Sequence, residues 1–303
     1  MLEPAQIAAL DAGHLATLLE QSLVRLASEM RGDFRSAMAV ACQREAASRP
    51  QVVLRMLEDN AQLASAKALP LCQDTGTVWV LLEIGSNAYG QPLTVAADIF
   101  SQVDTAVGRA WELAALRPSL LQDALVSRLN TGDNSPAFCD LSMRPQMLGA
   151  RLHIMLKGGG TDNASSQAML APGDGWPGVR RFVVEAVRSK AANACPPLLV
   201  GVGIGSTFDK VAALSKHALL REVGAANPCS ELDCYEAELL AEINATGIGP
   251  GGLGGQTTAL AVHLESAPCH IAALPVAVNL CCNAIRTVSF DLTGHWLEGG
   301  GQA

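Results

Sequence analysis

The chain has 303 residues, of which 49% are apolar, and its formal net charge at pH 7 is −8. Such a composition is typical of a globular protein with a large core, and the thinly spread lysines and arginines exclude a basic surface for nucleic acid. The first residues, MLEPAQIAALDAGH, lack a signal-peptide pattern, and no apolar run reaches the roughly 18 to 20 residues of a membrane span. We therefore expect a cytoplasmic protein without membrane contact.

The first half of the chain is predicted to begin with helices. From Ala5 to about Lys67, leucines recur at three- and four-residue steps, which predicts two or three amphipathic helices that end before Pro70. A strand, a helix, a polar loop and a second strand are then predicted, in this order: Thr77–Ile84, Ala96–Leu113, Asn130–Pro136 and Arg151–Lys157. The loop is interpreted as too polar to belong to a core.

The second half alternates helices and strands. Helices are predicted over Val179–Ala194, from Ser206 to about Val223, and over Glu231–Thr246; strands are predicted over Leu198–Ile204, Thr258–Leu264, Pro275–Cys281 and Thr287–Leu292. This mixture predicts an α/β (mixed α+β) fold. We expect one domain over residues 1–303, with a helical N-terminal lobe (1–67) followed by mixed sheets with packed helices (68–303).

Two glycine-rich segments invite a nucleotide-binding interpretation, which the residues do not favour. In Gly201–Ser206, Ser206 stands where a dinucleotide fingerprint needs its third glycine. A phosphate loop requires a lysine after its glycines, whereas in Lys157–Thr161 the lysine precedes them. Such glycines either form tight turns or present bare N–H groups to a carboxylate, with Lys157 adding a positive charge nearby.

The nine cysteines form no C-x-x-C pair or ferredoxin-type run. Their odd number, without a secretory signal, argues against a disulfide framework, and their spacing favours small buried residues for most of them. Three stand out by context. Cys72 lies in a polar turn at a strand entrance, Cys195 lies between a helix end and a strand led by two prolines, and Cys282 follows Cys281 at a strand end.

These contexts belong to longer strings that occur in a fixed order. They are PLCQDTG (70–76), NTGDNSPA (130–137), KGGGTDN (157–163), ACPPLLVGVGIG (194–205), GPGGLGGQTTALAVHLE (249–265) and LPVAVNLCCNAIR (274–286). Together they resemble the α-type domain of class I, iron-sulfur fumarate hydratases and of the related L(+)-tartrate dehydratases. The resemblance covers nearly the whole chain from about residue 50 onward.

The resemblance implies a [4Fe-4S] cluster and a set of site residues, and makes 68–303 the region that binds the cluster and the substrate. By motif, the three cluster ligands fall on Cys72, Cys195 and Cys282, and three ligands leave one iron open to act as a Lewis acid. Asp74 matches an acid-base residue, with a turn-forming role as the alternative. Carboxylate-binding positions are matched by Gln73, Arg117, Gly159 and Gly160. The chain departs from the family at Asn283, where His or Trp is common, and at Leu260, where single-chain fumarases look to have histidine.

The expected function follows from this resemblance. We expect the α subunit of an oxygen-sensitive hydro-lyase that hydrates fumarate to malate, because NTGDNSPA and GGGTDN are nearer the fumarase pattern. An L(+)-tartrate dehydratase α subunit is the alternative within the family, and a cluster-free nucleotide-binding or regulatory protein is the alternative outside it. The resemblance further implies a β-type subunit as partner, in a dimer of heterodimers, because in single-chain members a β-type domain follows the α-type region.

Overall fold

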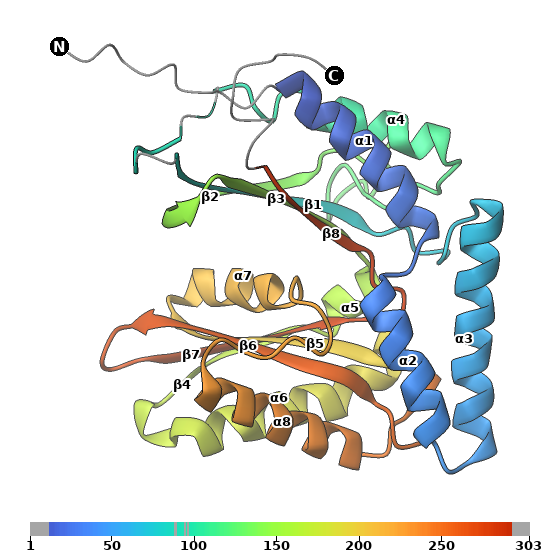
Figure 1. The fold of residues 1–303 in the computed structure, drawn as a ribbon, viewed down its shortest axis with the longest axis vertical. Helices are drawn as coiled ribbons and strands as arrows, with labels where there is room; N and C mark the ends of the chain where they lie inside the picture. The colour runs from blue at the N-terminus through green and yellow to red at the C-terminus, as the bar shows by residue number, and fades with distance from the viewer. Residues whose placement is uncertain (1–11, 88–89, 94, 96, 293–303) are drawn as a thin grey trace. The chain divides into compact units, whose positions relative to one another are not determined.

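The computed structural model describes residues 12–292 except 88, 89, 94 and 96 (Figure 1). Residues 5–11 of the predicted helical region, Ala96 at the start of the predicted helix, and the terminal GGGQA lie outside the described residues. The chain divides into two compact units. The first unit contains residues up to 29, 68–157 and from 286 onward; the second contains 30–67 and 158–285.

The first unit is built on one four-stranded sheet. Its strands, in the order β2-β1-β3-β8, are β2 (Phe138–Leu148), β1 (Thr77–Ser86), β3 (Ala150–Lys157) and β8 (Thr287–Asp291). β1 pairs in parallel with β2 and antiparallel with β3, which pairs antiparallel with β8. Two helices, α1 (Ala12–Ser28) and α4 (Val103–Leu113), cover the same face of the sheet (Figure 1).

The core of the first unit lies between these helices and the sheet. Leu15, Leu19 and Leu23 of α1 recur on one face and are fully buried, as are alternate residues of β1 from Val78 to Leu82. The helical period of 3.6 and the strand period of 2 thus point apolar side chains at each other. This packing holds the start of β1 in place.

The second unit also contains a four-stranded sheet, of order β4-β7-β5-β6. Its strands are β4 (Ser166–Leu170), β7 (Leu274–Cys281), β5 (Leu198–Ser206) and β6 (Ala259–Cys269). Its helices are α2 (Gly32–Arg44), α3 (Ser48–Lys67), α5 (Gly159–Asn163), α6 (Gly175–Lys190), α7 (Phe208–Ala218) and α8 (Ser230–Ala245), with 3-10 turns η1 (Pro172–Asp174), η2 (Ala191–Ala194) and η3 (Pro250–Gly252). α6 and α8 cover one face of the sheet and α7 covers the other (Figure 1).

The glycines of β5 are explained by helix packing. A Cβ atom added at Gly201 would lie 2.2 Å from the carbonyl oxygen of Ser215, and one added at Gly203 would lie 2.5 Å from that of Val211. Ser215 and Val211 both belong to α7, so only glycine in the strand allows this helix to approach it so closely. The G-x-G pattern therefore serves close packing at this strand.

The mixed α/β fold class is confirmed, and most predicted elements are present with shifted ends. Two strands were not predicted: β4, and β2, whose largely exposed side chains leave no apolar alternation to detect. α4 begins at Val103, and α7 ends at Ala218. Of the predicted N-terminal helices, α1 belongs to the first unit, and α2 and α3 to the second.

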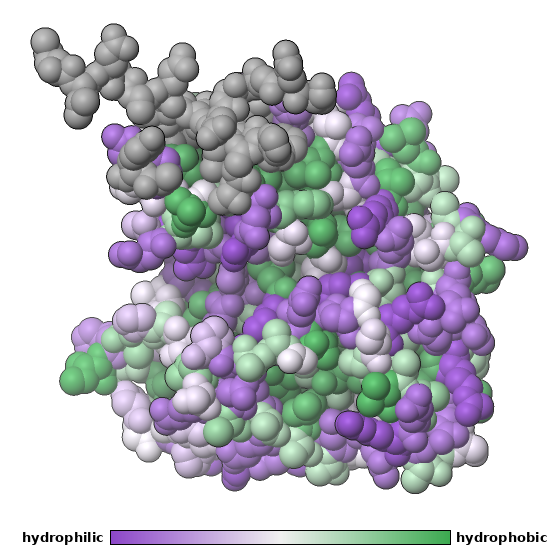
Figure 2. All heavy atoms as spheres, viewed as in Figure 1, coloured by the Kyte–Doolittle hydropathy of each residue, from purple (hydrophilic) through white to green (hydrophobic). Residues whose placement is uncertain are grey.

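No described helix is long and apolar enough to cross a membrane. On the face shown in Figure 2, polar and apolar residues are interspersed over the described surface.

Candidate functional site

A tight turn before β1 carries three of the predicted site residues. The Sγ atom of Cys72 lies 3.4 Å from Oε1 of Gln73, and the backbone amide of Gly76 donates to Oδ1 of Asp74 at 3.0 Å. Gly76 has a φ of +80°, and a Cβ atom there would lie 2.7 Å from the carbonyl oxygen of Lys157. Glycine is therefore required at the end of the turn, both for the backbone angle and for the close approach of β3.

A hydrogen-bonded brace ties this turn to the segment that contains Arg117. The hydroxyl of Thr75 donates to the carbonyl oxygen of Arg117 at 2.6 Å and lies 3.0 Å from the hydroxyl of Ser119. Oδ1 of Asn134 accepts the amides of Ser119 and Leu120, while its Nδ2 donates to the carbonyl of Gly76 at 3.1 Å. Asn134 is fully buried. The prediction that its loop is too polar for a core is therefore wrong at this residue, because both Oδ1 and Nδ2 of the buried side chain are hydrogen-bonded.

Two cations are buried beside the same turn. Lys157 is 1% exposed and Arg286 is 2% exposed. Nη2 of Arg286 donates to the carbonyl oxygen of Asp74 at 2.9 Å, while its Nε has no hydrogen-bond partner among the described residues. No described carboxylate lies within ion-pair distance of Arg286. Since an uncompensated buried charge costs several kcal/mol, this arrangement suits an anion.

In the second unit, Cys195 and Cys282 approach each other through the backbone. The amide nitrogen and Nδ2 of Asn283 donate to the carbonyl oxygen of Cys195 at 3.1 and 2.7 Å. Cys195 has a φ of +53°, a left-handed conformation that is uncommon for a residue other than glycine. Cys282 is partly exposed, whereas Cys281 is buried. These bonds hold the residue after Cys282 against Cys195.

Two glycine-rich segments lie beside this pair. The predicted glycine loop after β3 forms the short helix α5, and a Cβ atom on Gly160 would lie 3.6 Å from the carbonyl oxygen of Asn193 in η2. In the tract that follows α8, the amide of Gly251 donates to the carbonyl of Pro196 at 2.8 Å. A side chain at Gly252 would come within 3.2 Å of Ala192. Close backbone packing therefore shapes the surroundings of Cys195.

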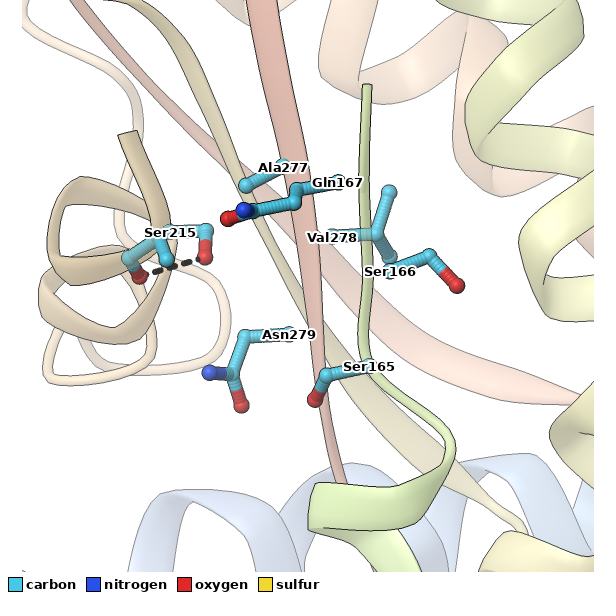
Figure 3. Close-up of a pocket in the computed structure, with 8 residues that line it drawn as sticks. Ser165, Ser166, Gln167, Ser215, Ala277, Val278 and Asn279 are labelled. Carbon is cyan, nitrogen blue, oxygen red and sulfur yellow. Dashed lines mark hydrogen bonds between the residues drawn. The ribbon is translucent and has the colours of Figure 1, made fainter. Parts of the chain in front are cut away.

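A pocket of about 220 Å³, lined by uncharged residues, opens in the second unit between β4, β7 and α7. Figure 3 shows Gln167 and Asn279 projecting from neighbouring strands toward the side of α7 that carries Ser215. Asn279 is buried, and its Oδ1 has no partner among the described residues. The lining is neutral, so it suits water or a neutral polar molecule better than a dianion, whose charge needs Lys or Arg.

Comparison with known proteins places the chain in a family. The sequence profile described as fumarate hydratase (Fumerase) matches residues 16–291. The chain belongs to this family. It is 36% identical, over 86% of its length and 92% of the relative, to a Methanocaldococcus jannaschii protein provisionally named L(+)-tartrate dehydratase subunit alpha. It is 33% identical to the L(+)-tartrate dehydratase subunit alpha of Escherichia coli K12, over 82% of each chain. The family makes this protein an enzyme of the hydro-lyase class.

The residues predicted for a fumarate hydratase site divide between the two units. The first unit contains Cys72, Gln73, Asp74, Arg117 and Lys157; the second contains Gly159, Gly160, Cys195 and Cys282. Within each unit, these predicted site residues lie on neighbouring segments. The complete set of cluster ligands stays a prediction. Sequence reasoning did not assign a role to Asn134 or to Arg286. Arg286 already stood in the family string CNAIR, whereas only the fold reveals the brace made by Asn134.

His263, which lies in one of the family motifs, has a structural position. His263 is buried in β6, where its Nδ1 lies 3.2 Å from the carbonyl oxygen of Ala218. Burial, assisted by the nearby charge of Arg221, lowers the pKa of His263 to about 3. Leu260, at the position where single-chain fumarases look to have histidine, packs against a buried apolar cluster of Met38, Ala41 and Leu54. The described part of the chain therefore offers an apolar contact where those enzymes look to have a titratable group.

Proposed function

We propose that this chain is the cluster-carrying α subunit of a [4Fe-4S] hydro-lyase that interconverts fumarate and malate together with a β-type subunit. The observation that carries the proposal is the buried Arg286, which has no anionic partner among the described residues and donates to the turn containing Asp74. Lys157 is buried beside the same turn. Such a concentration of positive charge suits a site that receives a dicarboxylate and an anionic set of thiolates.

The residues present fit a three-thiolate cluster. Cys72 and Cys282 are partly exposed and Cys195 is exposed, so none of the three is consumed by core packing, whereas Cys281 is. The left-handed backbone at Cys195 is a strained feature of the kind that persists at functional sites. The chain passes between the units at Lys157–Gly158 and at Ile285–Arg286, next to these motifs. When bound, such a cluster supplies an open iron that acts as a Lewis acid toward the substrate's carboxylate and hydroxyl.

The chain's own residues bind the substrate and move a proton. Arg117 and Lys157 bind the carboxylates by charge, and Gln73 adds a neutral donor. Gly159 and Gly160 leave room for a carboxylate to approach the backbone. The carboxyl group of Asp74 gives and takes the substrate proton. Its Oδ1 accepts the amide of Gly76, so the turn-forming role and the acid-base role coexist, and the hydrogen bond orients the carboxyl group.

A second candidate substrate is L(+)-tartrate. Both reported relatives carry L(+)-tartrate dehydratase in their names, and they cover most of this chain. Tartrate differs from malate by one hydroxyl group, and a single hydrogen-bonding residue can decide between such substrates. The NTGDNSPA and GGGTDN strings, which are nearer the fumarase pattern, favour fumarate.

The same relatives are named as alpha subunits, which supports a second subunit for this chain. We propose a cytoplasmic dimer of heterodimers in which the β-type subunit completes the site. Excluding water from the site would strengthen each electrostatic contact with the substrate.

The test is an anaerobic reconstitution of the full chain with its companion β-type polypeptide. We expect brown protein that bleaches in air, and hydration of fumarate only after the partner is added. A higher specificity constant for L(+)-tartrate than for fumarate would make L(+)-tartrate the preferred substrate. Anaerobically prepared protein without iron would refute the cluster, and full activity of the chain alone would refute the need for a partner.

A further inference from the structure

The loop that follows Arg117 presents apolar side chains to solvent. Leu125 is 86% exposed, Val126 is 89% exposed and Leu129 is 60% exposed. Single exposed apolar residues are common on protein surfaces and need no explanation. Three within five positions give one short loop an apolar tip, and exposed apolar patches mark contacts with other proteins.

The tip is held in one conformation by the side chain of Asp123. Its carboxylate accepts the backbone amides of Leu125 and Ser127, each at 2.9 Å, as well as those of Val126 and Arg128. The Ser127 hydroxyl donates to the same carboxylate. The hydroxyl and the amides hold the pKa of Asp123 below its ordinary value, so the carboxylate stays ionised. An apolar tip that is already ordered loses little conformational entropy when it binds.

The foot of the loop is joined to the candidate site. The amides of Ser119 and Leu120 donate to Asn134, whose Nδ2 donates to Gly76 at the end of the Asp74 turn. The amide of Thr131 donates to the carbonyl of Leu120 at 3.0 Å and closes the loop. The loop therefore extends from the same brace that holds the turn, two residues after Arg117.

We propose that the loop 119–131 is a docking element for the β-type subunit, with Leu125 and Val126 inserting into an apolar hollow of that subunit. The inference rests on the proposed function. A subunit that completes a site containing Arg117 must approach the residues that follow Arg117, and these are the residues of this loop. A second copy of the chain has no such reason to contact this loop, and self-association becomes an outcome of the test.

The experiment compares Val126→Asp with a matched control, Ile271→Asp, in the full cluster-loaded chain. Ile271 is 92% exposed but lies in the second unit, between β6 and β7. Binding of the purified β-type polypeptide is measured by anaerobic titration and by analytical ultracentrifugation. Val126→Asp should raise the Kd by roughly 30-fold or more, the scale of an interface hot spot, and Ile271→Asp should leave it unchanged. Asp123→Ala, which keeps the apolar residues but loosens the tip, should raise it by roughly tenfold.

Iron content and circular dichroism of each variant alone establish that the fold and the cluster are retained. Normal binding of the β-type subunit by Val126→Asp would overturn the docking role. The same conclusion would follow if the wild-type chain self-associates and Val126→Asp abolishes only that self-association. A wild-type pair that does not bind would refute both this inference and the proposed partner. A wild-type pair that binds through the loop but hydrates neither substrate would refute the proposed reaction alone.

Discussion

The two units hold their predicted site residues in different ways. In the first unit, Lys157 and Arg286 are buried cations, and a brace of side chains holds the turn that contains Cys72 and Asp74. In the second unit, the amide and the Nδ2 of Asn283, the residue after Cys282, donate to the carbonyl oxygen of Cys195 among closely packed glycine-rich segments. The first contribution thus depends on charge and the second on close backbone packing, so substitutions should affect them differently.

The largest expected effect is on the cysteines, which the proposal takes from both units. Cys72→Ala, Cys195→Ala or Cys282→Ala should remove most of the bound iron and nearly all activity, because each removes one of three thiolate ligands. Cys281→Ala is the matched control, since Cys281 is the buried neighbour of Cys282 and should alter packing only. Iron analysis and the anaerobic absorption spectrum measure the outcome. Retained iron in Cys282→Ala would instead assign the third ligand to Cys281.

The next effect separates chemistry from structure in the first unit. Asp74→Asn keeps an oxygen that can accept the Gly76 amide but removes the acid-base group. Turnover should fall by roughly a hundredfold or more, the scale of lost general acid-base catalysis, while the cluster spectrum stays unchanged. Turnover close to that of the wild type would leave Asp74 with its turn-forming role alone.

Arg286 tests whether the first unit depends on charge. Arg286→Met removes a buried cation of the site, so the KM for the dicarboxylate should rise by about tenfold or more. Without the cluster, the free energy of unfolding of Arg286→Met should be no lower than that of the wild type. The reason is that the substitution also removes a buried charge that has no ionic partner among the described residues. Arg151→Met, which breaks an exposed ion pair with Asp291, serves as the control and should leave KM unchanged.

Gly201 tests the dependence of the second unit on close packing. Gly201→Ala places a Cβ atom against the carbonyl of Ser215 and should lower the free energy of unfolding by about 1–3 kcal/mol, the usual cost of overpacking. Gly173→Ala is the control, because nothing lies within 4 Å of a Cβ atom there. Urea denaturation of both variants decides the point. Equal stability of the two would contradict the packing role of the β5 glycines.

The smallest effect concerns acid stability in the second unit. Because the pKa of His263 is lowered from 6.5 to about 3, the unfolded chain binds a proton in this range that the folded chain does not. Stability should therefore fall as the pH drops through 6.5, and the contribution of this residue should approach about 1.4 kcal/mol per pH unit near pH 5. In His263→Gln the slope of unfolding free energy against pH should be smaller, by an amount that approaches one proton near pH 5. An unchanged slope would show that His263 titrates normally in the fold.

Sequence reasoning recovered the fold class and most elements because their signals are local. The leucine spacing of α1 and the apolar run of β1 reflect periods that a short window reveals. β2 escaped prediction because its side chains are largely exposed, so its place as a strand comes from pairing with β1.

The sequence by itself determined which chemical groups are available: the three cysteines in the family strings, Asp74 two residues after Cys72, and the glycine-rich segments. Only the tertiary structure decided which of these groups are buried, braced or exposed. In the fold, Arg286 lies beside the turn that contains Asp74, although the two residues are 212 positions apart in the sequence. Asn134 joins that turn by hydrogen bonds to the loop that contains Val126. The physical reason is that burial and hydrogen-bond partnership depend on contacts between residues distant in the chain, which local patterns do not encode.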